Sequence, residues 1–193
     1  MNIKIDKQKY NIPTADNLTC RQYLECLEAS KSNDPFILRY LSIVTGFNYV
    51  DVCNANIDFT TIQRLIAWIG QIKNFDYFLI NQNTQVYIKG NLFVSTRKDF
   101  DVEKVGVSIL FQAKAERTES REVLAIYLLA ILLTPDFDAD KTEAKYEQLL
   151  EENYIKILSF STFFLSKYLK YSKTKKKHLI QRAMERIKNI TLK

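Results

Sequence analysis

Apolar residues recur every three or four positions over most of the chain, and this spacing predicts a mainly helical protein. The first helix is expected to begin after Thr19, because Gln22 stands three residues later as the second member of a capping box. The second is expected to carry Pro35 in its first turn and to end at Gly46. In all, helices are predicted over about residues 20–30, 35–45, 59–70, 100–117, 120–133, 141–152, 154–171 and 175–190.

Two of these helices have patterns that predict their place in the fold. Residues 120–133 are strongly apolar, so this helix is expected to be central, and Thr134-Pro135-Asp136 is expected to end it. The helix over 59–70 is expected to bury one face, which holds Ile62, Leu65, Ile66 and Ile69.

Two short stretches alternate between apolar and polar residues instead, which is typical of strands. Ile3 and Ile5 are followed by a polar turn and then by Tyr10 and Ile12. A second alternation covers about residues 85–97, with a turn expected at Lys89-Gly90-Asn91. The predicted fold class is therefore α+β and predominantly α-helical, with about seven or eight helices and one or two small β-hairpins.

The length of 193 residues fits one main domain, since domains usually hold about 100–200 residues. We assign residues 1–172 to a helical domain that contains both hairpins. Residues 173–193 are interpreted as a basic, amphipathic C-terminal helix that packs on this domain or on a partner.

The three cysteines, Cys20, Cys26 and Cys53, are odd in number and form no Cys-x-x-Cys motif, which favours reduced thiols. The purest apolar stretch, residues 123–133, is shorter than the ~18–20 residues that cross a bilayer. The sequence therefore predicts no membrane span.

The residues needed for most enzyme mechanisms are missing from the sequence. The single histidine, His178, follows three lysines, where positive charge disfavours its protonated form and no neighbour orients it. The four glycines are isolated, so they build no phosphate-binding loop. We therefore expect a protein that is not an enzyme and that uses no cofactor and no small-molecule substrate.

One acidic motif has two interpretations. Asp136, Asp138 and Asp140 alternate, and Glu147 stands where a calcium-binding loop places its bidentate glutamate. Lys141, however, stands where that loop needs a glycine. The alternative is a loop followed by a helix, with Asp140 as the N-cap and Glu143 as its capping-box partner.

The basic residues are concentrated at the C-terminal end. From Lys167 onward there are ten Lys or Arg and one acid, so this stretch carries +9 while residues 1–166 sum to −3. The pattern predicts an anionic partner, either nucleic acid or an acidic protein surface, or simply a solvated helical face. The residues that would contact an anionic partner are Lys173, Lys175, Lys176, Lys177, Arg182 and Arg186.

The last predicted helix also has an apolar face, formed by Leu179, Ile180, Ala183, Met184 and Ile187. In globular proteins such a face most often closes the core of its own domain. The other interpretation is that it docks on a partner protein.

The order of features at the two ends of the chain resembles small tail-assembly and virion proteins of tailed bacteriophages. At the N-terminus, Ile3-x-Ile5-Asp6-x-x-x-Tyr10-x-Ile12-Pro13 precedes Leu18-Thr19-x-x-Gln22-Tyr23-Leu24. Towards the C-terminus, an apolar helix is followed by Asp136-Phe137-Asp138, an acidic helix and Phe160-Ser161-Thr162-Phe163-Phe164-Leu165. The resemblance covers about the first quarter and the last third of the chain.

This resemblance implies a non-enzymatic structural protein of the particle, of ring or adaptor type, in the region of portal, neck and tail. Such a protein is made in the cytoplasm of the bacterial host and resides in the virion. Its expected partners are other virion or assembly proteins, or copies of itself in a ring. Two alternatives stay open: a transient tail-assembly chaperone that is absent from the virion, and a protein whose basic C-terminal end binds DNA.

Overall fold

The computed structural model describes residues 2–6, 8–13, 17–73, 85–94 and 101–191, without the side chains of residues 2, 68–73 and 175–191. Within these residues, eight helices and two antiparallel hairpins follow each other along the chain. They are β1 (Asn2–Ile5), β2 (Gln8–Asn11), α1 (Cys20–Ala29), α2 (Phe36–Thr45), α3 (Tyr49–Asn54), α4 (Phe59–Lys73), β3 (Gln85–Ile88), β4 (Asn91–Val94), α5 (Val105–Ala115), α6 (Arg121–Leu132), α7 (Ala139–Leu150) and α8 (Tyr154–Thr191). The predicted α+β class, predominantly helical, is confirmed.

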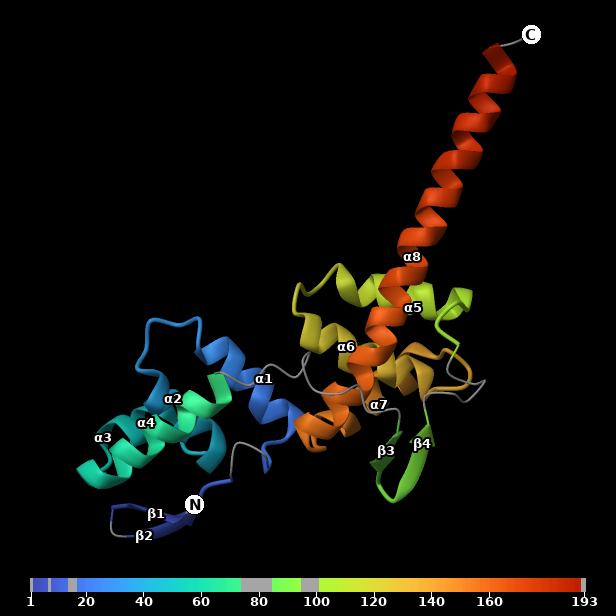
Figure 1. The fold of residues 1–193 in the computed structure, drawn as a ribbon. Helices are drawn as coiled ribbons and strands as arrows, with labels where there is room; N and C mark the ends of the chain where they lie inside the picture. The colour runs from blue at the N-terminus through green and yellow to red at the C-terminus, as the bar shows by residue number, and fades with distance from the viewer. Residues whose placement is uncertain (1, 7, 14–16, 74–84, 95–100, 192–193) are drawn as a thin grey trace.

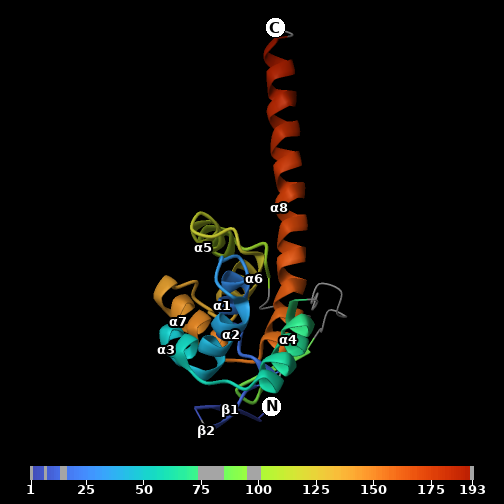
Figure 2. The ribbon, with the colours of Figure 1, turned by 90° about the vertical axis from the view of Figure 1, so that its left-hand side faces the viewer.

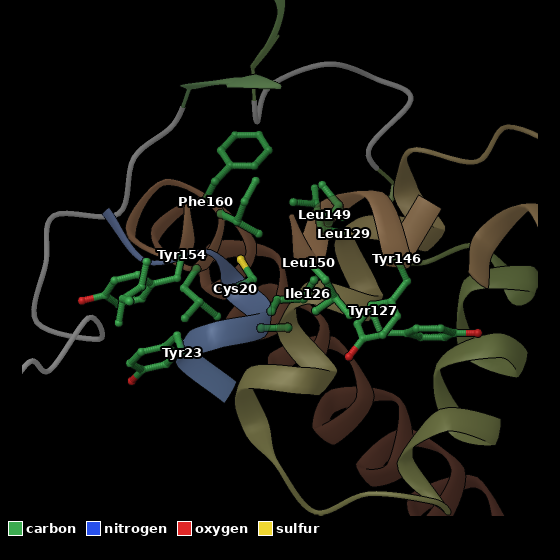
Figure 3. Packing of buried hydrophobic residues seen from close by; sticks show 14 of the residues in the cluster. Cys20, Tyr23, Ile126, Tyr127, Leu129, Tyr146, Leu149, Leu150, Tyr154 and Phe160 are labelled. Carbon is green, nitrogen blue, oxygen red and sulfur yellow. The ribbon is translucent and has the colours of Figure 1, made fainter. Parts of the chain in front are cut away.

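The centre of the fold is α6, as predicted. Every residue from Ala125 to Leu132 is buried, and α6 packs against α5, α7 and α8. Figure 3 shows Ile126 and Leu129 among the buried side chains of α1, α7 and α8. Ser120 caps α6 by accepting a hydrogen bond from the backbone N–H of Val123. Thr134 follows the helix and donates its hydroxyl to the carbonyl of Ala130, at 2.9 Å.

The starts of α1 and α8, which are far apart in the sequence, lie side by side. The backbone N–H of Cys20 donates to the carbonyl of Glu152, at 2.9 Å, and that of Tyr154 donates to the carbonyl of Leu18, at 3.1 Å. The ring of Tyr23 stacks on that of Tyr154, with centroids 4.3 Å apart. These contacts attach the first helix to the α6–α8 core.

Local sequence signals explain several helix boundaries. Thr19 and Gln22 form the predicted capping box, each accepting a backbone N–H of the other at 3.2 Å. Gly46 ends α2 with a positive φ of 74°, which glycine adopts without steric strain. Pro35 is the N-cap of α2, one residue before the helical position predicted for it.

Both predicted hairpins are present. In β1–β2, Ile3 pairs with Tyr10, and the buried side chains are Ile3, Ile5 and, just beyond the strands, Ile12. In β3–β4, Lys89 and Gly90 have φ of 47° and 79°, so they form the turn. Asn91, which was expected in that turn, instead pairs with Ile88 in the ladder.

The buried stripe predicted on α4 is partly wrong. Leu65 is fully buried, but Ile66 is 58% exposed. The reason is that α4 packs mainly against α2, so only a narrow face that includes Thr61 and Leu65 is covered. Ile62 is half-buried, and the side chain of Ile69 lies outside the described residues.

The largest difference from prediction lies at the C-terminal end. The helices predicted over 154–171 and 175–190 are one continuous helix, α8. The break was wrong because residues 154–191 contain no proline or glycine, the residues that most often interrupt a helix. Figures 1 and 2 show the end of α8 extending well beyond the other elements.

Candidate protein-binding surface

The first half of α8 is anchored in the core by large side chains. It packs against α6 along its length and touches α1 and β3. The buried residues are Tyr154, Ile157, Leu158, Ser159, Phe160, Ser161, Thr162, Phe164, Leu165 and Tyr168. Residues 157–162 are buried without a break, so the core surrounds this part of α8 and fixes the direction of the helix.

Around Tyr168 the character of α8 changes from buried to exposed. Tyr168 is 5% exposed and lies against Phe111 of α5, with ring centroids 4.5 Å apart. Lys167, Lys170 and Lys173 are exposed. Beyond this level α8 continues as the basic part of the sequence, and we call residues 173–191 of α8 the arm.

The arm holds most of the residues predicted to bind a partner. Lys173 is exposed, as a contact with an anionic partner requires. The other candidates have a helical backbone, but their side chains lie outside the described residues. These are the basic Lys175, Lys176, Lys177, Arg182 and Arg186 and the apolar Leu179, Ile180, Ala183, Met184 and Ile187. We call the other elements, from β1 to α7, together with the first half of α8, the body. Because the arm extends away from the body, the body does not cover it in this structure (Figures 1 and 2).

A second candidate surface is an open groove between α1 and α2, with a volume of about 430 Å³ and a mainly apolar lining. The lining residues are Leu24, Glu25, Glu28, Ala29, Ser32, Arg39, Ser42 and Ile43. Glu25 and Glu28 are exposed, whereas Leu24 and Ile43 are half-buried and form the apolar floor. The charge of Arg39 is balanced locally, because its guanidinium is paired with Asp34 and lies over the ring of Tyr49.

One turn before Glu25 on α1, Arg21 joins α1 to α7 through two ion pairs. Arg21 donates to Glu147 at 2.8 Å and to Glu151 at 2.7 Å. These hydrogen bonds raise the pKa of Arg21 above its usual value, so its charge is permanent. Arg21, Glu25 and Glu28 are spaced i, i+4 and i+7 and therefore share one face of α1. Lys31 also pairs with Glu28, at 2.8 Å. Arg21 and Lys31 thus stand among the four carboxylates of Glu25, Glu28, Glu147 and Glu151, and the group keeps a net charge of −2.

The candidate metal ligands do not come together. Asp138 is the N-cap of α7, accepting the backbone N–H of Lys141 at 2.8 Å, so the predicted N-cap at Asp140 is wrong by two residues. Asp136 pairs with the ammonium group of Lys141, and Glu147 pairs with Arg21. Among the residues that the structure describes, no group of three or more His, Cys, Asp or Glu could hold a metal ion.

Burial favours the neutral form of two thiols and one phenol, those of Cys20, Cys26 and Tyr146. Burial, and next the charge of Glu152, raises the pKa of the Cys20 thiol. Burial raises the pKa of Cys26 to about 12 and that of Tyr146 to about 12. Cys53, in contrast, is exposed. None of the three cysteines is in a disulfide.

Lys114 is a structural cation that sequence analysis did not identify. Its ammonium group lies 4.5 Å and 4.6 Å from the ring centroids of Tyr127 and Tyr146 and pairs with Glu143 at 3.0 Å. It thereby joins α5 to α6 and α7.

The groove between α1 and α2 was not predicted from the sequence either, because the packing of α1 against α2 is a tertiary contact. The sequence shows only that α1 has a charged face, from the i, i+4, i+7 spacing of its charged residues.

None of the helices within the described ranges is long and apolar enough to span a membrane. Comparison of the chain with protein families, with curated proteins and with solved structures gives no match.

Proposed function

We propose that this chain is a non-enzymatic structural or assembly protein that acts by binding other proteins, and that the arm makes the contact. The observation that carries this proposal is the construction of α8. Its first half is buried in the core, while its second half leaves the body as a helix with a basic and amphipathic sequence.

The anchoring makes the arm suited to a rigid contact. A free helical peptide must first form a costly initial turn, and most helices in proteins depend on packing for their stability. The arm is instead the continuation of a helix whose first turns are already formed and fixed by the core. A partner therefore meets a preorganised helix, which reduces the ordering cost of binding.

The tailed-phage resemblance supplies the context that we propose for this contact. We place the protein in the portal, neck and tail region of the particle, as a ring or adaptor component of the virion. The alternative within the same class is a tail-assembly chaperone, which binds transiently and is absent from the mature virion. Both roles use protein contacts and differ in whether the chain stays in the particle.

Mass spectrometry of purified particles and of lysates from cells producing them tests this context. A ring or adaptor should be recovered from the particles in a fixed ratio to the other structural proteins. Recovery from the lysate alone would support the chaperone role instead. Particles that assemble normally when the cells express only a chain ending at Lys173 would contradict a function of the arm in either role.

The charge of the arm favours one further candidate, binding to nucleic acid. Lys167, Lys170 and Lys173 are exposed, and the stretch from Lys167 onward carries +9. Contacts of this kind release counterions, so affinity for DNA should fall steeply as salt rises. Fluorescence anisotropy with labelled duplex DNA measures this affinity. Absence of binding at low salt, about 50 mM NaCl, where such contacts are strongest, would exclude DNA binding by the arm.

A further inference from the structure

The groove between α1 and α2 combines two properties that suit a particular kind of ligand. Its floor is apolar and includes Leu24 and Ile43, while Glu25 and Glu28 stand exposed beside it. A helix with one apolar and one basic face would fill the floor and place cations next to these carboxylates.

The charged residues around the groove also favour a basic ligand. Two cations partly balance the carboxylates beside the groove and those of α7: Arg21 pairs with Glu147 and Glu151, and Lys31 pairs with Glu28. Residues 20–45 and 136–152, which include α1, α2 and α7, together hold ten Asp or Glu and five Lys or Arg, a net charge of −5. A basic ligand is therefore attracted to this side of the molecule.

The chain itself contains a segment with the matching chemistry. Residues 175–190 of the arm have six Lys or Arg and one Glu, a net charge of +5. The same segment has apolar residues at helical spacing, from Leu179 to Ile187. As a helix it is about 24 Å long, enough to cover α1, which is about 15 Å.

The arm of the same copy does not serve as this ligand. It continues α8 in the direction set by the buried first half, and Figures 1 and 2 show it pointing away from the other elements. To reach its own groove, the helix would have to break between Tyr168 and Lys175, where no proline or glycine is present.

We propose that the groove between α1 and α2 binds residues 175–190 of a second copy of this chain. This inference rests on the proposed function and names one partner of the arm. The contact joins two different surfaces, so it is heterologous and repeats from copy to copy, which generates a ring if the rotation closes.

Site-specific photo-crosslinking tests the contact directly. A photo-reactive amino acid replaces Ser32 at the edge of the groove in a full-length chain, which is mixed with an equal amount of an isotopically heavy copy. After irradiation, peptides that join position 32 of one copy to residues 175–190 of the other are expected. The same label at Val50, which is 60% exposed on α3, serves as the control and should yield at least tenfold fewer of them. Crosslinks from position 32 that are absent, or that join other segments, would overturn the proposal.

Charge exchange provides a second readout that does not depend on the label. Glu25→Lys with Glu28→Lys, and separately Lys175→Glu with Lys176→Glu and Lys177→Glu, should each weaken self-association at least tenfold. Mixing the two variants should restore it, because the acidic arm then meets the basic groove. Reversal of two exposed acids elsewhere, Glu103→Lys with Glu116→Lys, should leave self-association unchanged. A mixture that fails to associate, while both variants melt like the original chain, contradicts the proposal.

These experiments distinguish a failure of the groove proposal from a failure of the proposed function. If particle assembly needs the arm but no crosslink joins the groove to a second copy, the groove proposal is overturned and the proposed function stands. If a chain ending at Lys173 also supports normal particle assembly, both are overturned.

Discussion

Tyr168 of α8 packs against Phe111 of α5 at the level where α8 leaves the other helices, with the two ring centroids 4.5 Å apart. Both side chains are almost fully buried, at 5% exposure each. Among the described side chains of α8, Tyr168 is the last one that is buried, and the exposed ones follow within two turns. It therefore separates residues that stabilise the fold from residues that are available to a partner.

Replacement of Tyr168 by alanine should destabilise the body. Removal of a buried aromatic ring usually lowers the free energy of unfolding by about 3 kcal/mol or more. The matched control is Lys170→Ala, an exposed change two residues away that should shift it by less than about 0.5 kcal/mol. Urea denaturation measures both. Equal effects of the two substitutions would show that α8 is not anchored at this level.

Gly106→Ala should also destabilise the protein, although alanine is the better helix former by about 1 kcal/mol. A Cβ atom at position 106 would lie 2.7 Å from Cγ of Phe137, closer than van der Waals contact permits. We expect a net loss of about 1–2 kcal/mol in the free energy of unfolding, as in overpacked sites. In a Phe137→Ala background the same change should become neutral or stabilising. A loss of the same size in both backgrounds would contradict this explanation.

Thr19→Ala should lower the free energy of unfolding by about 1 kcal/mol, because it removes the hydroxyl that caps the first turn of α1. The hydroxyl of Thr19 accepts a hydrogen bond from the backbone N–H of Gln22, at 3.2 Å. Backbone hydrogen bonds hold this end of α1 beside the start of α8. Thr19→Ser keeps the hydroxyl and is the control. Thermal unfolding followed by circular dichroism compares the two variants; a serine variant as unstable as the alanine variant would argue against the cap.

The stability of the fold should decrease above about pH 9. Burial raises the pKa of Cys26 from 9.0 to about 12 and also raises that of Cys20. Below pH 9 both thiols are neutral in the folded and unfolded states, whereas at higher pH the unfolded chain loses these protons first. At pH 10 this should lower the free energy of unfolding by about 1 kcal/mol per thiol.

Urea denaturation at pH 8 and pH 10 measures this effect, and a variant with Cys20→Ala and Cys26→Ala should show a smaller decrease. In the native protein, a thiol reagent should modify the exposed Cys53 rapidly and the two buried thiols only after unfolding. Rapid modification of all three cysteines in the native state would contradict the buried positions of Cys20 and Cys26.

Much of the fold could be predicted from the sequence because its signals are local. Thr19 with Gln22, Gly46 and Ser120 mark helix ends, and the alternation around Val86 marks a hairpin. The exposure of Ile66 could not be predicted, because it depends on how much of α4 its neighbours cover.

The candidate surfaces also combine features that the sequence predicts with features that depend on tertiary structure. The basic and apolar pattern of the arm is visible in the sequence, but its extension from the body depends on the uninterrupted course of α8. The groove depends on the tertiary contact of α1 with α2. The charged i, i+4, i+7 pattern of α1 indicates an exposed face but does not predict this contact. The ion pairs of Arg21 with Glu147 and Glu151 join residues more than 100 positions apart, and removing Glu147 from the predicted metal site follows from them.

We propose that the arm is a contact element added to a body that folds without it. Light scattering and thermal unfolding of the full-length chain and of a chain ending at Lys173 test this proposal. We expect a defined oligomer for the full-length chain, a monomer for the shorter one, and closely similar melting of their helices. The same native mass for both chains, or loss of the folded body on truncation, would contradict it.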